Sequence, residues 1–434
     1  MKPYNWQQPE VDHLTNILAT GNVAICGSDT GVGKTVISLA VAGNLGLKPL
    51  IVAPKAVLTS WRETAQAMGI EVLDIVNIEK LKARAKRKDA PLQKNNGVFA
   101  WSLEPGTLII FDEAHRFSGR ETQNSKILAK CRIQGLKVLL VSATLADDPT
   151  KTRALGYLLE LHRYKDFNRW LLGPGGCRLR DFPGGNRGIV FDGGPRGQKA
   201  LELLNQTIYP ARGHRIRVAE VPGFPEVAIY PEVYDLGNRS AKETDELYAL
   251  MQQEVQDAEQ ESNPLTQLLR LRQKTEILKI PVLIDRTNEL LEEGKSVVVF
   301  VSFRKTFFEL RSRLDQECSQ ILGDQKDRDE QIAAFQRNQT RVCLCMAQAG
   351  GLGINLGDTD GKHPRVSLIT PVFSVIELKQ VLGRIHRANS KSKAIQYIVY
   401  GAGTVEENIC RTLKRKIQNL NRMQDADLQG GLFT

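Results

Sequence analysis

The chain has 434 residues, enough for two or three domains and a large buried core. Hydrophobic residues make up 41% and charged residues 25%, which is typical of a soluble globular protein. Lysine and arginine outnumber aspartate and glutamate by 59 to 49. This excess of positive charge favours a polyanionic partner such as nucleic acid.

Membrane and secretory classes are not indicated by the sequence. The first seven residues contain no apolar signal core, and no run approaches the roughly 18 apolar residues of a membrane span. The 7 cysteines are scattered and lack a zinc-binding spacing, which favours a reducing compartment. We therefore expect an intracellular, soluble protein of the cytoplasm or nucleus with no membrane partner.

Short apolar runs alternate with helical patterns along the chain and predict buried parallel strands. The first group comprises residues 23–26, 49–53, 107–111 and 137–142. The second group comprises residues 296–302, 340–346, 365–370 and 394–399. Each group predicts an α/β layer structure, so the expected fold class is α/β with two lobes.

The composition changes between the two groups of strands. Residues 173–197 are rich in glycine and poor in periodic apolar residues, which predicts an irregular segment. Residues 240–279 have helical patterns. We expect an N-terminal lobe at 1–225 with a glycine-rich excursion at 164–217, a helical connecting segment at 226–279 and a C-terminal lobe at 280–434.

A glycine-rich turn follows the predicted strand 23–26 and precedes a helical run. In this arrangement backbone N–H groups wrap phosphates, and the helix N-terminus adds its partial positive charge. Lys34 supplies a full charge to the β and γ phosphates, and the Thr35 hydroxyl can ligate Mg²⁺. The alternative is a chance glycine turn, and Ser28 stands where the strict pattern has glycine. The turn predicts ATP and Mg²⁺ as ligands, with ATP contacts from Ser28, Asp29, Thr30, Gly31, Val32, Gly33, Lys34 and Thr35.

Two adjacent carboxylates, Asp112 and Glu113, follow the predicted strand 107–111. An acid at the carboxyl end of a strand beside a phosphate loop can hold Mg²⁺, and we assign this role to Asp112. A second carboxylate can take the proton of the attacking water, and we assign this role to Glu113. An Asp-Glu pair alone is a common surface feature, so the phosphate loop upstream is what favours catalysis.

These residues resemble the first three motifs of superfamily 2 helicases: Gly31 to Thr35, Asp112-Glu-Ala-His115 and Ser142-Ala-Thr144. The resemblance implies two tandem RecA-like lobes with ATP in the cleft between them. It also implies that His115, Ser142 and Thr144 couple hydrolysis to movement. Gln7 resembles the adenine-reading glutamine of the family. The segment with Pro54, Lys55, Trp61 and Glu63 resembles the Swi/Snf-type segment that lies along the nucleic-acid backbone.

The second lobe carries the motifs that separate a motor from other ATPases. Gln380-Val-Leu-Gly-Arg384-Ile-His-Arg387 is similar to motif six, in which the arginines act as arginine fingers. Arg384 and Arg387 are three residues apart, so on one helical turn they would share a face. Residues 347–356 resemble motif five, and 298–303 resemble motif four. From these motifs the resemblance implies a nucleotide contact by Gly353 and nucleic-acid contacts by Ser302, Arg304, Gly350 and Gly351.

Some residues depart from the Swi/Snf pattern. Ala114 and Ser-Ala-Thr at 142–144 match strand-separating helicases, whereas the stretch 164–217 resembles the smaller annealing helicases. We expect an ATP-dependent DNA helicase or translocase, acting as a monomer on duplex, forked or single-stranded DNA. An RNA helicase is the alternative, as is a nucleic-acid clamp that binds ATP without translocation; the intact Glu113 and both motif-six arginines argue against the clamp.

Overall fold

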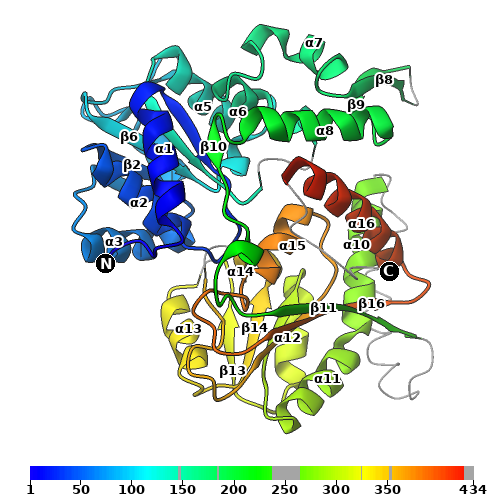
Figure 1. Cartoon of the computed structure of the whole chain (residues 1–434). Helices are drawn as coiled ribbons and strands as arrows, with labels where there is room; N and C mark the ends of the chain where they lie inside the picture. Colours follow the sequence, from blue (N-terminus) through cyan, green and yellow to red (C-terminus); the bar gives the residue numbers. More distant parts are fainter. Residues whose placement is uncertain (145–147, 183–184, 237–263, 324, 351–353, 425–434) are drawn as a thin grey trace. The chain divides into compact units, whose positions relative to one another are not determined.

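The computed structural model describes residues 1–144, 148–182, 185–236, 264–323, 325–350 and 354–424 (Figure 1). The chain forms two compact units: the first contains Met1–Pro222 and a C-terminal segment that begins at Ile417, and the second contains Gly223–Lys416. Among the described helices, none combines the length and the apolar composition that crossing a membrane requires.

The first unit is built on a parallel sheet of six strands in the order β10-β1-β7-β6-β2-β3. Its central strands are short and mostly buried because helices cover both of their faces. The strands are β1 (Val23–Cys26), β2 (Lys48–Val52), β3 (Asp74–Val76), β6 (Thr107–Asp112), β7 (Lys137–Val141) and β10 (Gly213–His214). A separate two-stranded hairpin consists of β4 (Leu92–Asn95) and β5 (Val98–Trp101).

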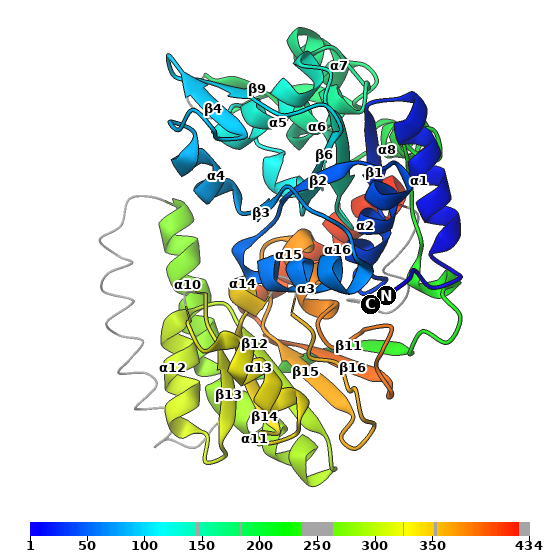
Figure 2. The same ribbon diagram turned by 90° about the vertical axis from the view of Figure 1, so that its left-hand side faces the viewer.

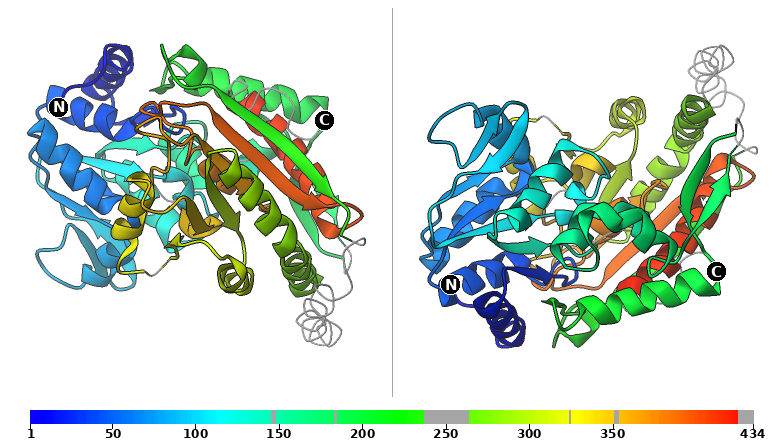
Figure 3. Two further views of the ribbon diagram at one scale, coloured as in Figure 1. Left: turned by 90° about the horizontal axis from the view of Figure 1, so that it is seen from below. Right: turned by 90° about the horizontal axis from the view of Figure 1, so that it is seen from above.

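Right-handed crossovers determine which helices cover which face of this sheet. One face is covered by α1 (Gln8–Thr20), α2 (Lys34–Asn44) and α3 (Leu58–Met68), as Figure 2 shows. The main apolar core lies on the other face, where Ile25, Ile109 and Leu140 pack beneath helices. These helices are α4 (Ile78–Arg84), α5 (Gln123–Ile133), α6 (Arg153–Leu158) and α8 (Pro195–Ile208). Both views of Figure 3 show helices on either side of the strands.

The prediction that residues 173–197 are irregular is wrong in part, because two strands and the start of a helix lie within them. After α7 (Phe167–Leu172), the strands β8 (Cys177–Asp181) and β9 (Arg187–Phe191) form an antiparallel hairpin, and α8 follows. A small core of Phe167, Leu171 and Cys177 anchors the base of the hairpin. Glycines obscured this hairpin: Gly176 precedes β8 and Gly185 precedes β9, with φ of 63° and 78°, and Gly188 lies within β9.

The second unit has a parallel sheet of six strands in the order β11-β16-β15-β12-β14-β13. Every residue of β12 and β15 is buried, as expected for central strands covered on both faces. The strands are β11 (Val227–Tyr234), β12 (Ser296–Val301), β13 (Cys318–Ile321), β14 (Val342–Met346), β15 (Arg365–Ile369) and β16 (Ala394–Gly401).

The helices of the second unit also lie on both faces of its sheet. The core on one face joins α10 (Pro264–Leu278), α11 (Ile280–Glu292) and α12 (Arg304–Arg313) to the strands. Right-handed crossovers place α13 (Arg328–Gln336) and α15 (Val375–Leu382) on the opposite face. The short α14 (Ala347–Gly350) follows β14, and α16 (Val405–Gln424) follows the last strand.

All eight predicted strands are confirmed within two residues at each end. The prediction of a helical connection at 226–279 is wrong for its first residues. Val227–Tyr234 is a strand that pairs with β16 along its whole length. This edge strand contains Pro231 and alternates only weakly in burial, so it lacks the apolar run of a central strand. Residues 240–263, predicted to be helical, lie outside the described ranges.

A buried ion pair ties the start of α16 to the second unit. The Lys279 ammonium lies 2.8 Å from Glu406 Oε1, and the two side chains are 0% and 2% exposed. Lys279 also donates to the carbonyl of Val399 at 2.9 Å, and Glu406 accepts from the N–H of Gly401 at 3.2 Å. Each charge therefore has a charged and a neutral partner, which offsets its desolvation.

Glu406→Gln should lower the free energy of unfolding of the second unit by about 3 kcal/mol, because the Lys279 charge would stay buried without its counter-ion. Urea unfolding would measure this loss. Glu226→Gln is the matched control, since Glu226 pairs with Lys393 at 3.1 Å on the surface of the same unit and should change stability little. The double variant Lys279→Met/Glu406→Gln should lose less than the two single losses combined, and strict additivity would contradict the ion-pair account.

Candidate ATP site

The predicted ATP residues of the first unit lie at one edge of its sheet. Strands β1, β7 and β6 are adjacent and parallel, so their carboxyl ends meet at the same edge. The phosphate loop follows β1, Ser142 follows β7, and Asp112 ends β6. Three motifs that are far apart in the sequence thus come together at this edge, where ligands of open α/β sheets usually bind.

The phosphate loop has the predicted order of strand, turn and helix. Gly31 and Gly33 have φ of 90° and 79°, the left-handed region that glycine adopts without strain. A Cβ atom on Gly33 would lie 2.6 Å from Gln7 Nε2, so a side chain at this position would displace the end of the Gln7 side chain. Lys34 is the first residue of α2, which directs the helix N-terminus at the turn.

The side chains of Ser28 and Asp29 are bound within the first unit itself. Ser28 Oγ donates to Glu10 Oε2 at 2.6 Å and accepts from the N–H of Ile216 at 2.7 Å. Asp29 Oδ1 pairs with Arg215 at 2.9 Å, and Asp29 Oδ2 accepts from the N–H of Val218 at 3.0 Å. The N–H of Asp29 also donates to the carbonyl of Ile216 at 3.1 Å, so the ATP contacts of Ser28 and Asp29 stay predictions. The Ser28 hydroxyl joins the loop to Glu10 of α1.

Lys34 and Gln7 both bind carbonyl groups of the phosphate loop. The Lys34 ammonium donates to the carbonyls of Ser28 at 3.0 Å and Asp29 at 2.9 Å. Gln7 is 1% exposed, donates to the carbonyl of Val32 at 2.8 Å and accepts from the N–H of Tyr4 at 2.8 Å. One N–H and one lone pair of the Gln7 amide remain for a ligand. Its reading of adenine stays a prediction.

Asp112 and Glu113 occupy an unusual piece of backbone. Glu113 has φ of 52°, which is rare for a residue other than glycine and typical of strained functional sites. Its N–H donates to Asp112 Oδ1 at 2.9 Å. Burial, followed by the nearby Glu113 charge, raises the pKa of Asp112 to about 6, while Trp61 and Lys34 oppose the shift. A cation at this position would favour the charged carboxylate.

His115 links this pair of carboxylates to the third motif. Its Nδ1 lies 3.1 Å from Ser142 Oγ and 3.3 Å from Glu113 Oε2. Burial lowers the pKa of His115, so the ring is neutral near pH 7. Ser142 donates its own proton to the carbonyl of Thr144, and a carboxylate only accepts. Nδ1 must therefore carry the hydrogen, and His115 connects Glu113 to Ser142 and Thr144.

The oxygen-rich residues at this edge fit a magnesium ion. The Thr35 hydroxyl and the Asp112 carboxylate are the hard donors that Mg²⁺ prefers, and both follow carboxyl ends of strands in the same sheet. Within the described ranges no three His, Cys, Asp or Glu side chains gather as a metal-binding group. Mg²⁺ usually takes one or two protein ligands together with water and substrate phosphates, and Thr35 and Asp112 would supply two.

The motif-six arginines of the second unit converge on one carbonyl. Arg384 and Arg387 donate to the carbonyl of Ile354, at 3.2 and 2.6 Å respectively. The prediction that they share one helical turn is wrong, because α15 ends at Leu382 and Gly383 is its C-cap. Gln380 lies inside α15 and is half-buried. Gly353 lies outside the described ranges.

The predicted nucleic-acid residues lie in loops or at helix ends. Lys55 is exposed, follows the buried Pro54 and begins the 3-10 turn Lys55–Val57 that leads into α3. In the second unit, Ser302 follows β12 and the exposed Arg304 begins α12. Gly350 ends α14, and Gly351 lies outside the described ranges. Their contacts with nucleic acid stay predictions.

Two buried carboxylates that support the motifs were missed by the sequence reasoning. Glu276 accepts from the N–H groups of Ser302 at 2.9 Å and Phe303 at 3.0 Å, so it fixes the turn after β12. Glu10 is fully buried under the phosphate loop. Glu10 stands one turn before Leu14 on the apolar stripe of α1, and a carboxyl on such a stripe is a signal that could have identified it.

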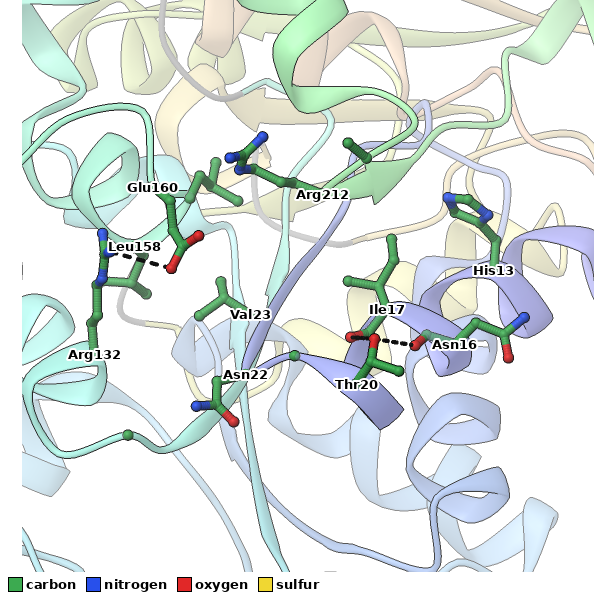
Figure 4. Close-up of a pocket in the computed structure, with 14 residues that line it drawn as sticks. His13, Asn16, Ile17, Thr20, Asn22, Val23, Arg132, Leu158, Glu160 and Arg212 are labelled. Carbon is green, nitrogen blue, oxygen red and sulfur yellow. Dashed lines mark hydrogen bonds and ion pairs between the residues drawn. The ribbon is translucent and has the colours of Figure 1, made fainter.

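A cavity of about 790 Å³ in the first unit lies away from this edge (Figure 4). Its lining includes Asn22 and Val23, at the amino end of β1, together with His13, Arg132 and Arg212. The phosphate loop follows the opposite end of the same strand. The cavity is therefore a feature separate from the candidate ATP site.

Comparison with known families assigns the class. The family model for DEAD/DEAH box helicases matches residues 9–152, and the model for the helicase conserved C-terminal domain matches residues 279–389. The chain belongs to the superfamily 2 helicases, which are nucleic-acid-dependent ATPases with two tandem RecA-like lobes.

Two relatives and one solved structure are similar to most of this chain. A protein of Acanthamoeba polyphaga mimivirus, which bears the provisional name ATP-dependent RNA helicase, is 32% identical over 99% of this chain and 85% of its own length. A CHD3-type chromatin-remodeling factor of Arabidopsis thaliana is 23% identical over 91% of this chain but only 35% of its own length. The structure of S. cerevisiae Dbp5 bound to RNA has a TM-score of 0.55, covers 99% of this chain and 89% of Dbp5, and shares 14% identity, which shows the fold.

Glu113→Gln should reduce the maximal rate of ATP hydrolysis by about 10²–10⁴-fold, because an amide cannot accept the proton of the attacking water. ATP binding should be retained. Steady-state turnover and equilibrium binding of a fluorescent ATP analogue would measure the two effects. Glu202→Gln, at an exposed position of α8, is the matched control. A Glu113→Gln protein with the parental rate would remove Glu113 as the base.

Glu10→Gln should change stability in a pH-dependent way. Burial raises the pKa of Glu10 to about 7, against the opposing effects of Ser28, Cys26 and Lys34. The folded chain thus binds this proton more tightly than the unfolded chain, so the wild type loses stability as pH rises from about 4.5 to 7. Glutamine cannot lose a proton, and the variant should gain roughly 1–3 kcal/mol relative to wild type between pH 5 and pH 8. A stability difference that does not change with pH would contradict this account.

Proposed function

We propose that this chain is an ATP-dependent RNA helicase in which hydrolysis at the edge of the first sheet drives movement along the nucleic acid. The observation that carries the RNA assignment is the mimivirus relative, whose name specifies RNA and which matches 99% of this chain. The sequence reasoning favoured DNA, and the comparisons support its RNA alternative better.

In this proposal Lys34 binds the β and γ phosphates, and backbone groups of the phosphate loop hold the same oxygens. Thr35 and Asp112 hold Mg²⁺, which when bound neutralises phosphate charge. Glu113 orients the attacking water and takes its proton. Arg384 and Arg387 stabilise charge that develops on the γ-phosphate, a role that makes hydrolysis depend on both units.

An exposed basic surface in the first unit supports a polyanionic track. Residues 163–199 contain eight basic and three acidic residues, so they carry half of the net charge of +10. On the β8–β9 hairpin, Arg178 and Arg187 are 65% and 64% exposed, and Arg180 lies 5.7 Å from the ring of the exposed Phe182. Arginine with an aromatic ring suits contact with phosphates and unpaired bases.

DNA is the second candidate track. The segment from Pro54 to Glu63 and the glycine-rich motif five resemble Swi/Snf-type proteins, and one relative is named a CHD3-type chromatin-remodeling factor. The case for DNA rests on these resemblances.

Single-stranded RNA should stimulate the maximal ATPase rate more than single-stranded, duplex or forked DNA at equal nucleotide concentration. Binding should weaken with salt, with a log–log slope of about −0.7 for each phosphate neutralised on a single strand. Parallel reactions with Lys34→Ala protein give the background, because loss of the phosphate-binding lysine should abolish turnover.

Unwinding of a tailed RNA duplex and regression of a labelled DNA fork should be measured in parallel with the ATPase rates. Stronger stimulation by duplex or forked DNA, with remodelling of the fork, would assign the chain to the DNA-tracking class. Equal rates with and without every nucleic acid would instead indicate a clamp that binds ATP without moving.

A further inference from the structure

Trp61 forms a direct hydrogen bond with the predicted metal ligand. Its indole Nε1 donates to Asp112 Oδ2 at 2.8 Å, while Asp112 Oδ1 accepts from the N–H of Glu113 at 2.9 Å. The two oxygens of one carboxylate are thus each held by one donor, which fixes the plane of the group. Each oxygen has a further lone pair, so both bonds are compatible with a ligated ion or its water.

The environment of Trp61 makes this bond rigid. Trp61 is 1% exposed and is the largest of the fully buried side chains. It lies on α3, which packs against α2 and β3. An indole held in this way has little conformational entropy left to lose when Asp112 binds an ion, whereas a mobile donor would lose more.

Trp101 shows what a purely structural indole does in the same unit. Its Nε1 donates to the backbone carbonyl of Ile127 at 3.1 Å, and the ring is 5% exposed. Both tryptophans satisfy a buried N–H, but only Trp61 does so with a carboxylate at the ligand-binding edge. A hydrogen bond to an ionised group is shorter and about twice as strong as one between neutral groups.

We propose that Trp61 is a positioning residue for the metal: its indole N–H holds Asp112 in the orientation that binds Mg²⁺ with ATP. The proposal rests on the ATP chemistry of the proposed function and is independent of the nature of the track. Donors behind a metal ligand typically contribute about 10–100-fold to metal affinity or activity.

The test compares Trp61→Phe with Trp101→Phe, because each variant keeps an aromatic ring and loses one indole N–H. Binding of a fluorescent ATP analogue is measured in Mg²⁺ and in EDTA, without nucleic acid. We expect the gain in affinity due to Mg²⁺ to fall about 10-fold in Trp61→Phe and to stay unchanged in Trp101→Phe. Turnover should fall in parallel, and excess Mn²⁺, a tighter-binding ion, should restore part of it.

The outcomes separate the two hypotheses. If the wild type gains no affinity from Mg²⁺, the proposed ATP site itself fails. If the wild type gains affinity and Trp61→Phe gains as much, Trp61 only packs α3 and the inference is overturned. Equal losses in both variants would indicate damage to the fold and would also overturn it.

A second measurement needs no change at Trp61. The chain has 4 tryptophans, and selective ¹⁵N-indole labelling gives one N–H resonance for each. Phenylalanine variants at Trp6, Trp101 and Trp170 assign the Trp61 signal by elimination. Adding Mg²⁺ to the ATP-bound protein should shift the Trp61 signal and leave that of Trp101 in place. A Trp61 signal that does not respond to Mg²⁺ would overturn the inference.

Discussion

The parallel pairing of β1, β7 and β6 is the constraint on which the candidate ATP site depends. Because these neighbouring strands run in one direction, each delivers the loop after its carboxyl end to the same edge of the sheet. The phosphate loop, the third motif and the carboxylate pair therefore lie close together in the fold although they are far apart in the sequence. A change of register in β6 by one residue would turn the Asp112 side chain to the other face of the sheet.

The electrostatics of this edge follow from the same packing. Helices on both faces of the sheet exclude water, and this burial raises the pKa of Glu10 to about 7 and that of Asp112 to about 6. The Lys34 charge opposes both shifts. Lys34 therefore lies where its charge compensates two buried carboxyls as well as any bound phosphate. Its loss would alter the folded site even before a ligand binds.

The sequence was sufficient to predict that Lys34, Asp112 and Glu113 lie at one site, but insufficient to predict the groups that hold them in place. Lys34, Asp112 and Glu113 each belong to a short motif at the carboxyl end of one strand, so the local sequence is enough to identify them. Trp61 lies 51 positions from its hydrogen-bond partner Asp112, and Arg215 lies 186 positions from Asp29. The order of strands in the sheet brings such long-range partners together, and local sequence patterns do not reveal that order.

Errors in the predicted elements have similar physical causes. The edge strand β11 was missed because it has a neighbouring strand on one side only and is more exposed than a central strand, so it lacks a continuous apolar run. The helical turn expected at Arg384 and Arg387 ends early at Gly383, yet both side chains reach the carbonyl of Ile354. A shared backbone acceptor therefore brings the two arginines together where helical periodicity was expected to do so.

The ATP-binding groups and the predicted track-binding groups differ in how firmly the fold holds them. Gln7, Ser28 and Trp61 are buried and hydrogen-bonded, so the chemistry is set by the core of the first unit. Lys55, Arg178 and Arg304 are exposed on loops, a hairpin and a helix end. Exposed side chains can change without cost to the core, whereas the buried set cannot. The motifs consequently define an ATPase far more sharply than they define a track, and RNA and DNA motors can share the same buried residues while differing at the surface.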